Sequence, residues 1–370
     1  MTSERTSTIR TVAEAFNPRH NSLNAIRLAL AIIVIVSHSW PTGGYGETPR
    51  FGDQDPGNWA VAGFFAISGY LITSSRMHTR TLVDYLWRRV LRIYPAFFVV
   101  LILMAFVAAP ITASVTGDGT WSVGTGLSFV IHNIAIEIRQ YGIGNTLQNV
   151  PYPGVWNGSL WTLFYEFLCY VAIGLAVTLI PRRWVTAAVA AAATACAAAT
   201  FAFNFTNLSA PTTIELSAML GGFFAGGALL YLLGDRVPST ALLAITAGVL
   251  VIVLALLGVS QVLAGLPVAY LMLYAGSYLP LQRIGATNDI SYGAYIYAFP
   301  LQQILAYVFP NQMLPVFAFA AISIAITIPF AWASWLLVEQ PALKLKKLTT
   351  RAKDGRARRS KDARTPSRAR

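Results

Sequence analysis

Long apolar runs alternate with short polar segments along most of the chain. A helix needs about 20 mostly apolar residues to cross the hydrocarbon core of a bilayer. The stretch 123–138 is apolar but short, and it contains His132, Asn133 and Glu137, which predicts an interfacial or re-entrant helix. The pattern as a whole predicts an all-α polytopic membrane protein with about ten transmembrane helices, at 24–40, 59–76, 91–112, 159–180, 184–203, 212–233, 239–258, 261–280, 289–309 and 313–338.

The basic residues favour one orientation of these helices. Lys and Arg concentrate in the cytoplasmic segments of membrane proteins. With the N-terminus inside, the outer segments hold only Arg50 and Arg139, and the remaining basic connections fall inside. Counting 123–138 as a further span would break this alternation. The charges therefore predict that both termini lie inside, in a multi-pass protein of the cell (plasma or inner) membrane.

Composition supports the membrane assignment. Of 370 residues, 55% are hydrophobic and 11% are charged, with a mean hydropathy of +0.57, whereas soluble domains carry about 25% charged residues. The net charge of +12 lies mostly in the segment 344–370, which holds twelve basic and two acidic residues and no aromatic ones. A basic segment beside a membrane helix is typical of an anchor to anionic lipids, and nucleic-acid binding is disfavoured.

Three regions follow from these features. Residues 1–22 form a cytosolic N-terminal segment, residues 23–342 the transmembrane domain, and residues 343–370 a basic cytosolic tail predicted to be disordered. The first apolar segment would serve as an uncleaved signal-anchor, because residues 1–24 have no apolar centre. Cys169 and Cys196 lie inside apolar runs without metal-like spacing, which predicts core packing and no metal site.

Ionisable residues inside apolar runs are candidates for function, because a charge near the bilayer centre costs several kcal/mol. Arg27 and His38 are eleven positions apart, about three whole helical turns, so they share a face and lie roughly 16 Å apart along the axis. Glu166 has a depth comparable to that of His38, and a carboxylate that orients an imidazole is a common general-base arrangement. Glu215 and Asp289 lie near span ends and are interpreted as structural.

An arginine cluster lies where the third span leaves the cytoplasm. Arg88, Arg89 and Arg92 occur within five positions and are followed by Tyr94 and a proline. Arg89 and Arg92 share a helix face, and guanidinium groups bind phosphate in a bidentate manner. Positive-inside anchoring explains any one of these arginines. Three together favour a phosphorylated cytosolic donor.

Five motifs in order resemble the integral-membrane acyltransferase family 3, bacterial enzymes that O-acylate cell-envelope sugars and some secreted metabolites. The resemblance extends from about Asn21 to Lys347. Its motifs are Arg27 and His38 with ten residues between them, FFAISGYL at 64–71, RxxRIYP at 89–95, SLWTLxxE at 159–166, and VEQP at 338–341. Many relatives carry a His in a late aromatic stretch, where this chain has Ala298. That difference would affect the choice of acceptor.

The resemblance implies an acyl-CoA donor, acetyl-CoA in the simplest case, and no permanently bound cofactor. His38 would be the catalytic base, Arg27 its required partner, and Glu166 the acidic residue of its motif. Arg89 and Arg92 would contact the donor phosphates, with Arg88 and Tyr94 beside them. Ser68 and Gly69 match a Ser-Gly-Phe/Tyr motif, whose small size would admit the pantetheine arm. The predicted function is transfer of an acyl group from cytosolic acyl-CoA to a hydroxyl of a sugar-containing acceptor, which is a polysaccharide, a glycolipid or a glycosylated metabolite.

Other functions stay open at this point. Buried Arg, His and Glu also occur in proton-coupled transporters, so the alternative is a proton-coupled transporter or flippase of a glycolipid. Against it, no inverted repeat is visible, and the arginine cluster lies at the membrane edge, not at the midplane. A second class of membrane O-acyltransferases uses a late His, whereas all four His here fall within the first 132 residues. A non-catalytic scaffold would predict no effect of His38→Ala.

Overall fold

The computed structural model describes residues 9–117, 119–310 and 312–346, and over these ranges the chain is all-helical, without strands. Its helices are α1 (Val12–Ala15), α2 (Leu23–Gly43), α3 (Pro56–His78), α4 (Leu82–Leu103), η1 (Met104–Ala108), α5 (Ala109–Thr116), α6 (Val123–Asn133), α7 (Trp161–Leu179), α8 (Arg182–Phe205), α9 (Thr212–Leu232), α10 (Ala241–Leu256), α11 (Ser260–Leu263), α12 (Gly265–Tyr278), α13 (Ser291–Val308), α14 (Val316–Ser334), η2 (Trp335–Glu339) and α15 (Gln340–Lys344). The N-terminal segment before residue 9 and the tail beyond Lys346, with its predicted disorder, lie outside the described residues.

Within the part of the chain that the structure describes, six helical segments are long and apolar enough to cross a membrane, which indicates a multi-pass membrane protein. They are Leu23–Gly43, Leu82–Thr116, Trp161–Leu179, Arg182–Phe205, Thr212–Leu232 and Val316–Lys344. The other four predicted spans overlap α3, α10, α12 and α13, which are shorter or less apolar. The count of ten spans and the orientation of the termini stay predictions.

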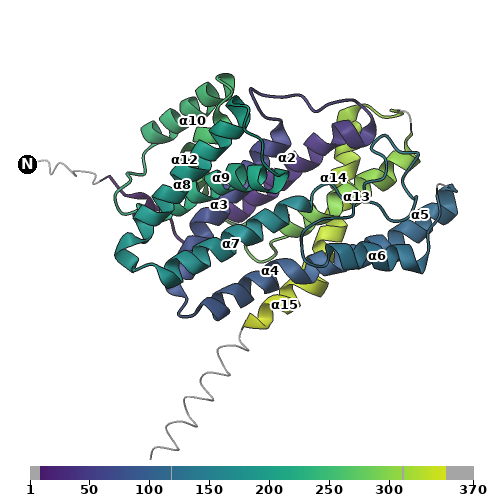
Figure 1. Ribbon diagram of the computed structural model, residues 1–370, viewed down its shortest axis with the longest axis horizontal. Helices are drawn as coiled ribbons and strands as arrows, with labels where there is room; N and C mark the ends of the chain where they lie inside the picture. The colour runs from purple at the N-terminus through teal and green to yellow at the C-terminus, as the bar shows by residue number, and fades with distance from the viewer. Residues whose placement is uncertain (1–8, 118, 311, 347–370) are drawn as a thin grey trace, which may run out of the picture.

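The helices form one bundle with α2 and α3 in its middle. One side of the bundle is built from α8, α9, α10 and α12, and the other from α13 and α14, while α4 packs along α7 (Figure 1). Helix α6, with 11 residues, is about 16 Å long. It is therefore too short to span a bilayer, in agreement with the prediction of a non-spanning helix at 123–138.

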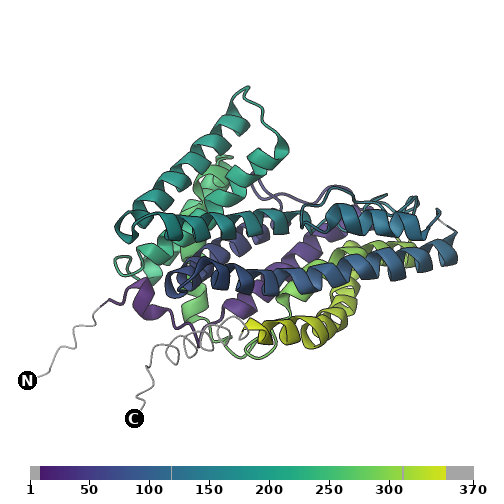
Figure 2. The ribbon, with the colours of Figure 1, turned by 60° about the horizontal axis from the view of Figure 1, so that its bottom comes forward.

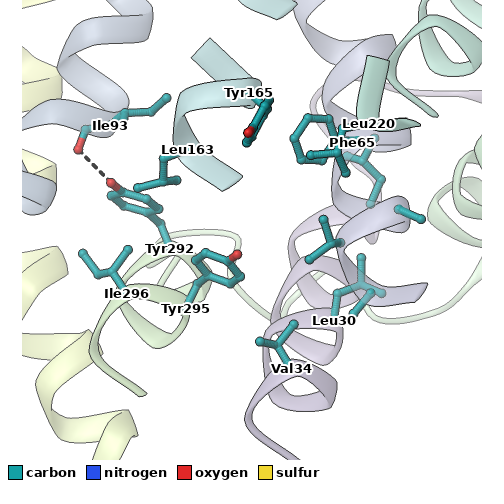
Figure 3. Close-up of a cluster of buried hydrophobic side chains, with 14 of the residues drawn as sticks. Leu30, Val34, Phe65, Ile93, Leu163, Tyr165, Leu220, Tyr292, Tyr295 and Ile296 are labelled. Carbon is teal, nitrogen blue, oxygen red and sulfur yellow. Dashed lines mark hydrogen bonds between the residues drawn. The ribbon is translucent and has the colours of Figure 1, made fainter. Parts of the chain in front are cut away.

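Helix α13 is buried along nearly its whole length. Of its 18 residues, 14 are buried, and they include several Tyr and both Gln302 and Gln303. Tyr292 and Tyr295 belong to the buried cluster that α13 forms with α7, α2 and α3, and the hydroxyl of Tyr292 donates to the carbonyl of Ile93 at 2.8 Å (Figure 3). A helix that faces protein on all sides can keep polar side chains inside the membrane. This burial explains why α13 can carry several polar residues.

Two long helical segments contain a π-helical turn. The segment that begins with α4 passes through η1 into α5, and α14 curves strongly before η2 and α15 (Figure 2). Pro329 lies inside α14, where it removes one helical hydrogen bond and favours a bend. The η2 turn places Glu339 inside the protein, with only 2% of its surface exposed.

Helices α3 and α9 are in backbone contact. A Cβ atom added at Gly69 would lie 2.0 Å from the carbonyl oxygen of Phe224, and one added at Gly227 would lie 2.0 Å from that of Ala66. Small residues allow membrane helices to approach this closely. Gly69 thus packs α3 on α9, and its role in admitting the pantetheine arm stays a prediction.

We expect Gly69→Ala to destabilise the protein by about 1–3 kcal/mol, the usual range for overpacking, because the backbone of α9 must move away. The matched control is Gly248→Ala on α10, where the added Cβ makes ordinary contact at 3.9 Å and helix propensity favours Ala. Thermal unfolding in detergent compares the two. A Gly69→Ala variant as stable as the control would contradict the close α3–α9 contact.

Candidate active site

His38 lies beside a cavity of about 220 Å³, here called the His38 cavity. Its walls come from α2, α3, α13 and the segment that leads into α7. The Nδ1 atom of His38 is 3.5 Å from the hydroxyl of Ser159, and its ring packs edge-on against Phe299 at a centroid distance of 5.2 Å. The neighbouring Ala298 is buried, with 2% of its surface exposed. The imidazole is therefore held at the edge of a space that a small ligand can enter.

The segment before α7 is fastened to α13. The side chain of Asn157 donates to the carbonyl of Ile296 at 2.8 Å and accepts from the backbone N–H of Ser159 at 3.0 Å. The hydroxyl of Tyr295 donates to the carbonyl of Ser159 at 2.9 Å and shares a 2.6 Å hydrogen bond with Thr162. These contacts fix the position of Ser159 next to His38.

Asp55 is the carboxylate that lines the His38 cavity. It caps the N-terminus of α3, where its Oδ1 accepts from the backbone N–H of Asn58 at 2.9 Å and from the hydroxyl of Ser37 at 3.1 Å. Asp55 was not among the site residues predicted from the sequence. The signal was present, because Asp before Pro at the start of an apolar helix is a typical N-cap, but a cap alone does not indicate a ligand site.

Glu166 lies in a different place from the one expected. It accepts hydrogen bonds from the hydroxyl of Ser68 at 2.8 Å and from Tyr170, and it lines a second cavity of about 40 Å³, the Glu166 cavity, together with Arg27. Three residues line both cavities: Val61, Thr162 and Tyr295. The two spaces are therefore neighbours. The carboxylate that shares a cavity with His38 is Asp55, and not Glu166.

Arg27 and His38 lie on one face of α2, as the spacing predicts, because they line these two adjoining cavities. The partner of Arg27, however, is Asp289, at 3.0 Å from its Nη1 atom. Asp289 also accepts from Arg92 at 2.5 Å, and Arg92 reaches Glu339 at 3.6 Å. The structure therefore joins Arg27 to the arginine cluster.

The arginines of α4 differ in their surroundings. Arg92 is paired with two carboxylates, whereas the buried Nε atoms of Arg88 and Arg89 have no hydrogen-bond partner among the described residues. Burial and the charges of these three arginines lower the pKa of Lys346 to about 8. This end of the bundle thus gathers several cationic groups.

Tyr94 is not part of that cationic group. It is two positions after Arg92, which places it about 200° around the helix. Its ring stacks on Phe98 at a centroid distance of 6.2 Å and an interplanar angle of 7°. The structure therefore places Tyr94 on another face of α4 from the arginines.

The arrangement forms a row that runs from His38 and its cavity through the Glu166 cavity to Arg27, which Asp289 links to Arg92 of the arginine cluster. His38 can take a proton from a hydroxyl in its cavity, and the carboxylate of Asp55 stabilises a positive charge there. Arg88, Arg89 and Lys346 can hold phosphate groups. Cys169 and Cys196 are free and half-buried against an apolar cavity between α7, α8 and α9, away from this row.

Comparison with known proteins agrees with this chemistry. The family described as an acyltransferase domain, acyltransferase 3, matches residues 20–336. The chain is 25% identical over 335 residues to an O-acetyl transferase of Shigella phage Sf6, covering 87% of this chain and 96% of the phage protein. It is 27% identical over 363 residues to Nodulation protein 10 of Rhizobium leguminosarum biovar viciae, covering 88% and 94% of the two chains. No solved structure shows a significant match. The chain therefore belongs to the acyltransferase 3 family, and it is an O-acyltransferase that resides in a membrane.

Proposed function

We propose that this enzyme transfers an acyl group, acetyl in the simplest case, from cytosolic acyl-CoA to a hydroxyl of a sugar-containing acceptor. The observation that carries the proposal is the pair of adjoining cavities between His38 and Arg27, together with the salt bridges through Asp289 that link Arg27 to the arginine cluster. The name of the phage relative supports acetyl as the group transferred. In this arrangement both termini lie in the cytosol and the basic tail faces the anionic inner leaflet of the cell membrane.

The donor phosphates bind at the Arg88 and Arg89 end of the bundle. Both guanidinium groups offer donors that the described protein groups leave unused, and Lys346 adds a third positive charge near them. Arg92 has a different task, because its charge is already balanced by Asp289 and Glu339. It holds the middle of α4, the start of α13 and the π-turn η2 together beneath the phosphate site.

The pantetheine arm then reaches from the phosphate site toward His38 past Arg27, Ser68 and Glu166. The Glu166 cavity, at about 40 Å³, has room for little more than one water molecule, which occupies roughly 30 Å³ in the liquid. Donor binding therefore requires the surrounding helices to separate. The polar groups of Ser68 and Glu166 offer hydrogen-bond partners to the amides of the arm.

The chemical step is a direct transfer. His38 takes the proton of the acceptor hydroxyl, and the hydroxyl oxygen attacks the thioester carbonyl. The C–S bond breaks, the ester forms, and the CoA sulfur receives the proton from the imidazolium as it leaves. Asp55 stabilises that imidazolium through its negative charge. The comparable membrane depth of Glu166 and His38 had suggested Glu166 for this role.

Replacing His38 by Ala should lower acetyl transfer by about 100-fold or more, the usual contribution of a general base. The measurement follows radiolabel from acetyl-CoA into glycolipid and polysaccharide in membranes. His132→Ala is the matched control, because His132 lies on α6 and bonds to its own helix at Ser128. Equal labelling by the His38 variant and the wild type would exclude His38 as the base.

Asp55→Asn tests the charge separately from the fold. Asn is as good an N-cap residue as Asp, so α3 should form normally. We expect kcat to fall about tenfold, with little change in the KM for acetyl-CoA, because only the charge beside the imidazole is lost. Glu166→Gln is the comparison. A larger kcat loss in Glu166→Gln than in Asp55→Asn would restore Glu166 as the partner of His38.

We expect Arg89→Gln to affect donor binding and Arg92→Gln to affect stability. Arg89→Gln should raise the KM for acetyl-CoA about tenfold, since one charge-assisted phosphate contact is lost, while the thermal stability stays unchanged. Arg92→Gln leaves Asp289 and Glu339 with one cation fewer and should cost about 3–5 kcal/mol of stability. The exposed Arg183→Gln is the control. A stable Arg92→Gln enzyme with the raised KM would reverse these assignments.

A further inference from the structure

A third cavity, of about 380 Å³, lies beside the His38 cavity, between α7, α9 and the segment 134–141. Its lining includes Tyr141, Trp161, Phe164, Tyr165, Glu137 and Thr213, and it is called the aromatic pocket below. The volume lies within the range of about 300–1,000 Å³ that is typical of small-molecule sites. The proposed mechanism does not use this pocket.

The aromatic pocket continues into the His38 cavity. Trp161, the first residue of α7, lines both spaces. Its ring packs edge-on against Tyr165 at 5.7 Å, and Tyr165 packs in the same way against Phe164 at 5.3 Å. A ligand seated in the aromatic pocket therefore lies next to the space in which His38 takes its proton.

The segment that closes the pocket is held rigidly. The fully buried Asn133 accepts from the backbone N–H groups of Arg139 and Gln140 at 2.9 and 3.1 Å and donates to the carbonyl of Gln140 at 2.7 Å. The buried Ile136 has a φ of +71°, which is a strained value for a β-branched residue. Strain of this kind persists where the surroundings impose it, and it clusters at ligand sites.

The lining suits an uncharged, ring-shaped, polar ligand. Glu137 is the carboxylate of the pocket, and its Oε2 accepts from Nε and Nη2 of Arg139, so this pair is neutral overall. The aromatic faces carry partial negative charge, which attracts the C–H face of a sugar ring. Since the other lining residues are uncharged, an anionic ligand would gain little here, and a lipid tail would offer no hydrogen-bond donor to the Glu137 carboxylate.

We propose that the aromatic pocket binds a pyranose ring of the acceptor, stacked on Trp161 or Tyr141 with a hydroxyl donating to Glu137. The neighbouring hydroxyl of the acceptor then extends into the His38 cavity. The assignment of this ring as acceptor rests on the proposed acyl transfer, whereas the binding of a sugar in this pocket does not depend on it.

The first test measures transfer by the purified full chain in nanodiscs. The donor is radiolabelled acetyl-CoA, and the acceptors are p-nitrophenyl pyranosides of glucose, galactose, mannose and rhamnose. For the best acceptor, Tyr141→Ala and Glu137→Gln should each raise the acceptor KM about tenfold. The KM for acetyl-CoA should stay unchanged. Tyr278→Ala is the matched control, because Tyr278 is an exposed tyrosine on α12 packed against Tyr274.

The second test measures binding without donor, by saturation-transfer-difference NMR of the same glycosides. Wild type and Tyr278→Ala should transfer saturation to the ring C–H protons, and Tyr141→Ala should reduce that transfer. Saturation transfer together with failed acetylation would support the pocket and refute the proposed function. His38-dependent acetyl-CoA turnover without any glycoside binding, or an acceptor KM that neither variant changes, would refute the pocket and leave the proposed function standing.

Discussion

A largely buried network of four charged side chains determines how the central helices meet. Its members come from α2, α4, the start of α13 and η2: Arg27, Arg92, Asp289 and Glu339. An uncompensated charge inside a membrane protein costs several kcal/mol. Each of these elements therefore reaches its place only when the other three are present. Since the four elements are far apart in sequence, the network ties the two halves of the chain into one bundle.

The rest of the site depends on this arrangement. Once α2 and α13 are joined through Asp289, the face of α2 with Arg27 and His38 lies against the polar face of α13 that carries Tyr295. Tyr295 in turn fixes Ser159 and Thr162 at the start of α7. The π-turn η2 contributes by placing Glu339 inside, which agrees with the frequent occurrence of such turns at functional sites.

Several features were predictable from the sequence because they depend on local periodicity. The ten apolar runs correspond to helical segments, and the shared face of Arg27 and His38 follows from the helical repeat alone. The partners of these residues were not predictable, because depth in the membrane does not specify which way a helix is turned. Glu166 matches His38 in depth but faces Ser68 and Tyr170. Arg89 and Arg92 share a face, yet among the described residues Arg92 alone of the two meets carboxylates, since these come from segments nearly 200 residues or more away in the chain.

The glycine contact between α3 and α9 determines which walls of the site can move. Gly69 and Gly227 bring the two backbones together with no side chain between them. Helices α3 and α9 therefore behave as one rigid unit. At this contact there are no side chains between the two helices that could rearrange when a substrate enters. Any widening of the small space beside Glu166 must therefore come from the opposite walls, α7 and α13. In the proposed mechanism, the donor arm would therefore enter on the side of α7 and α13.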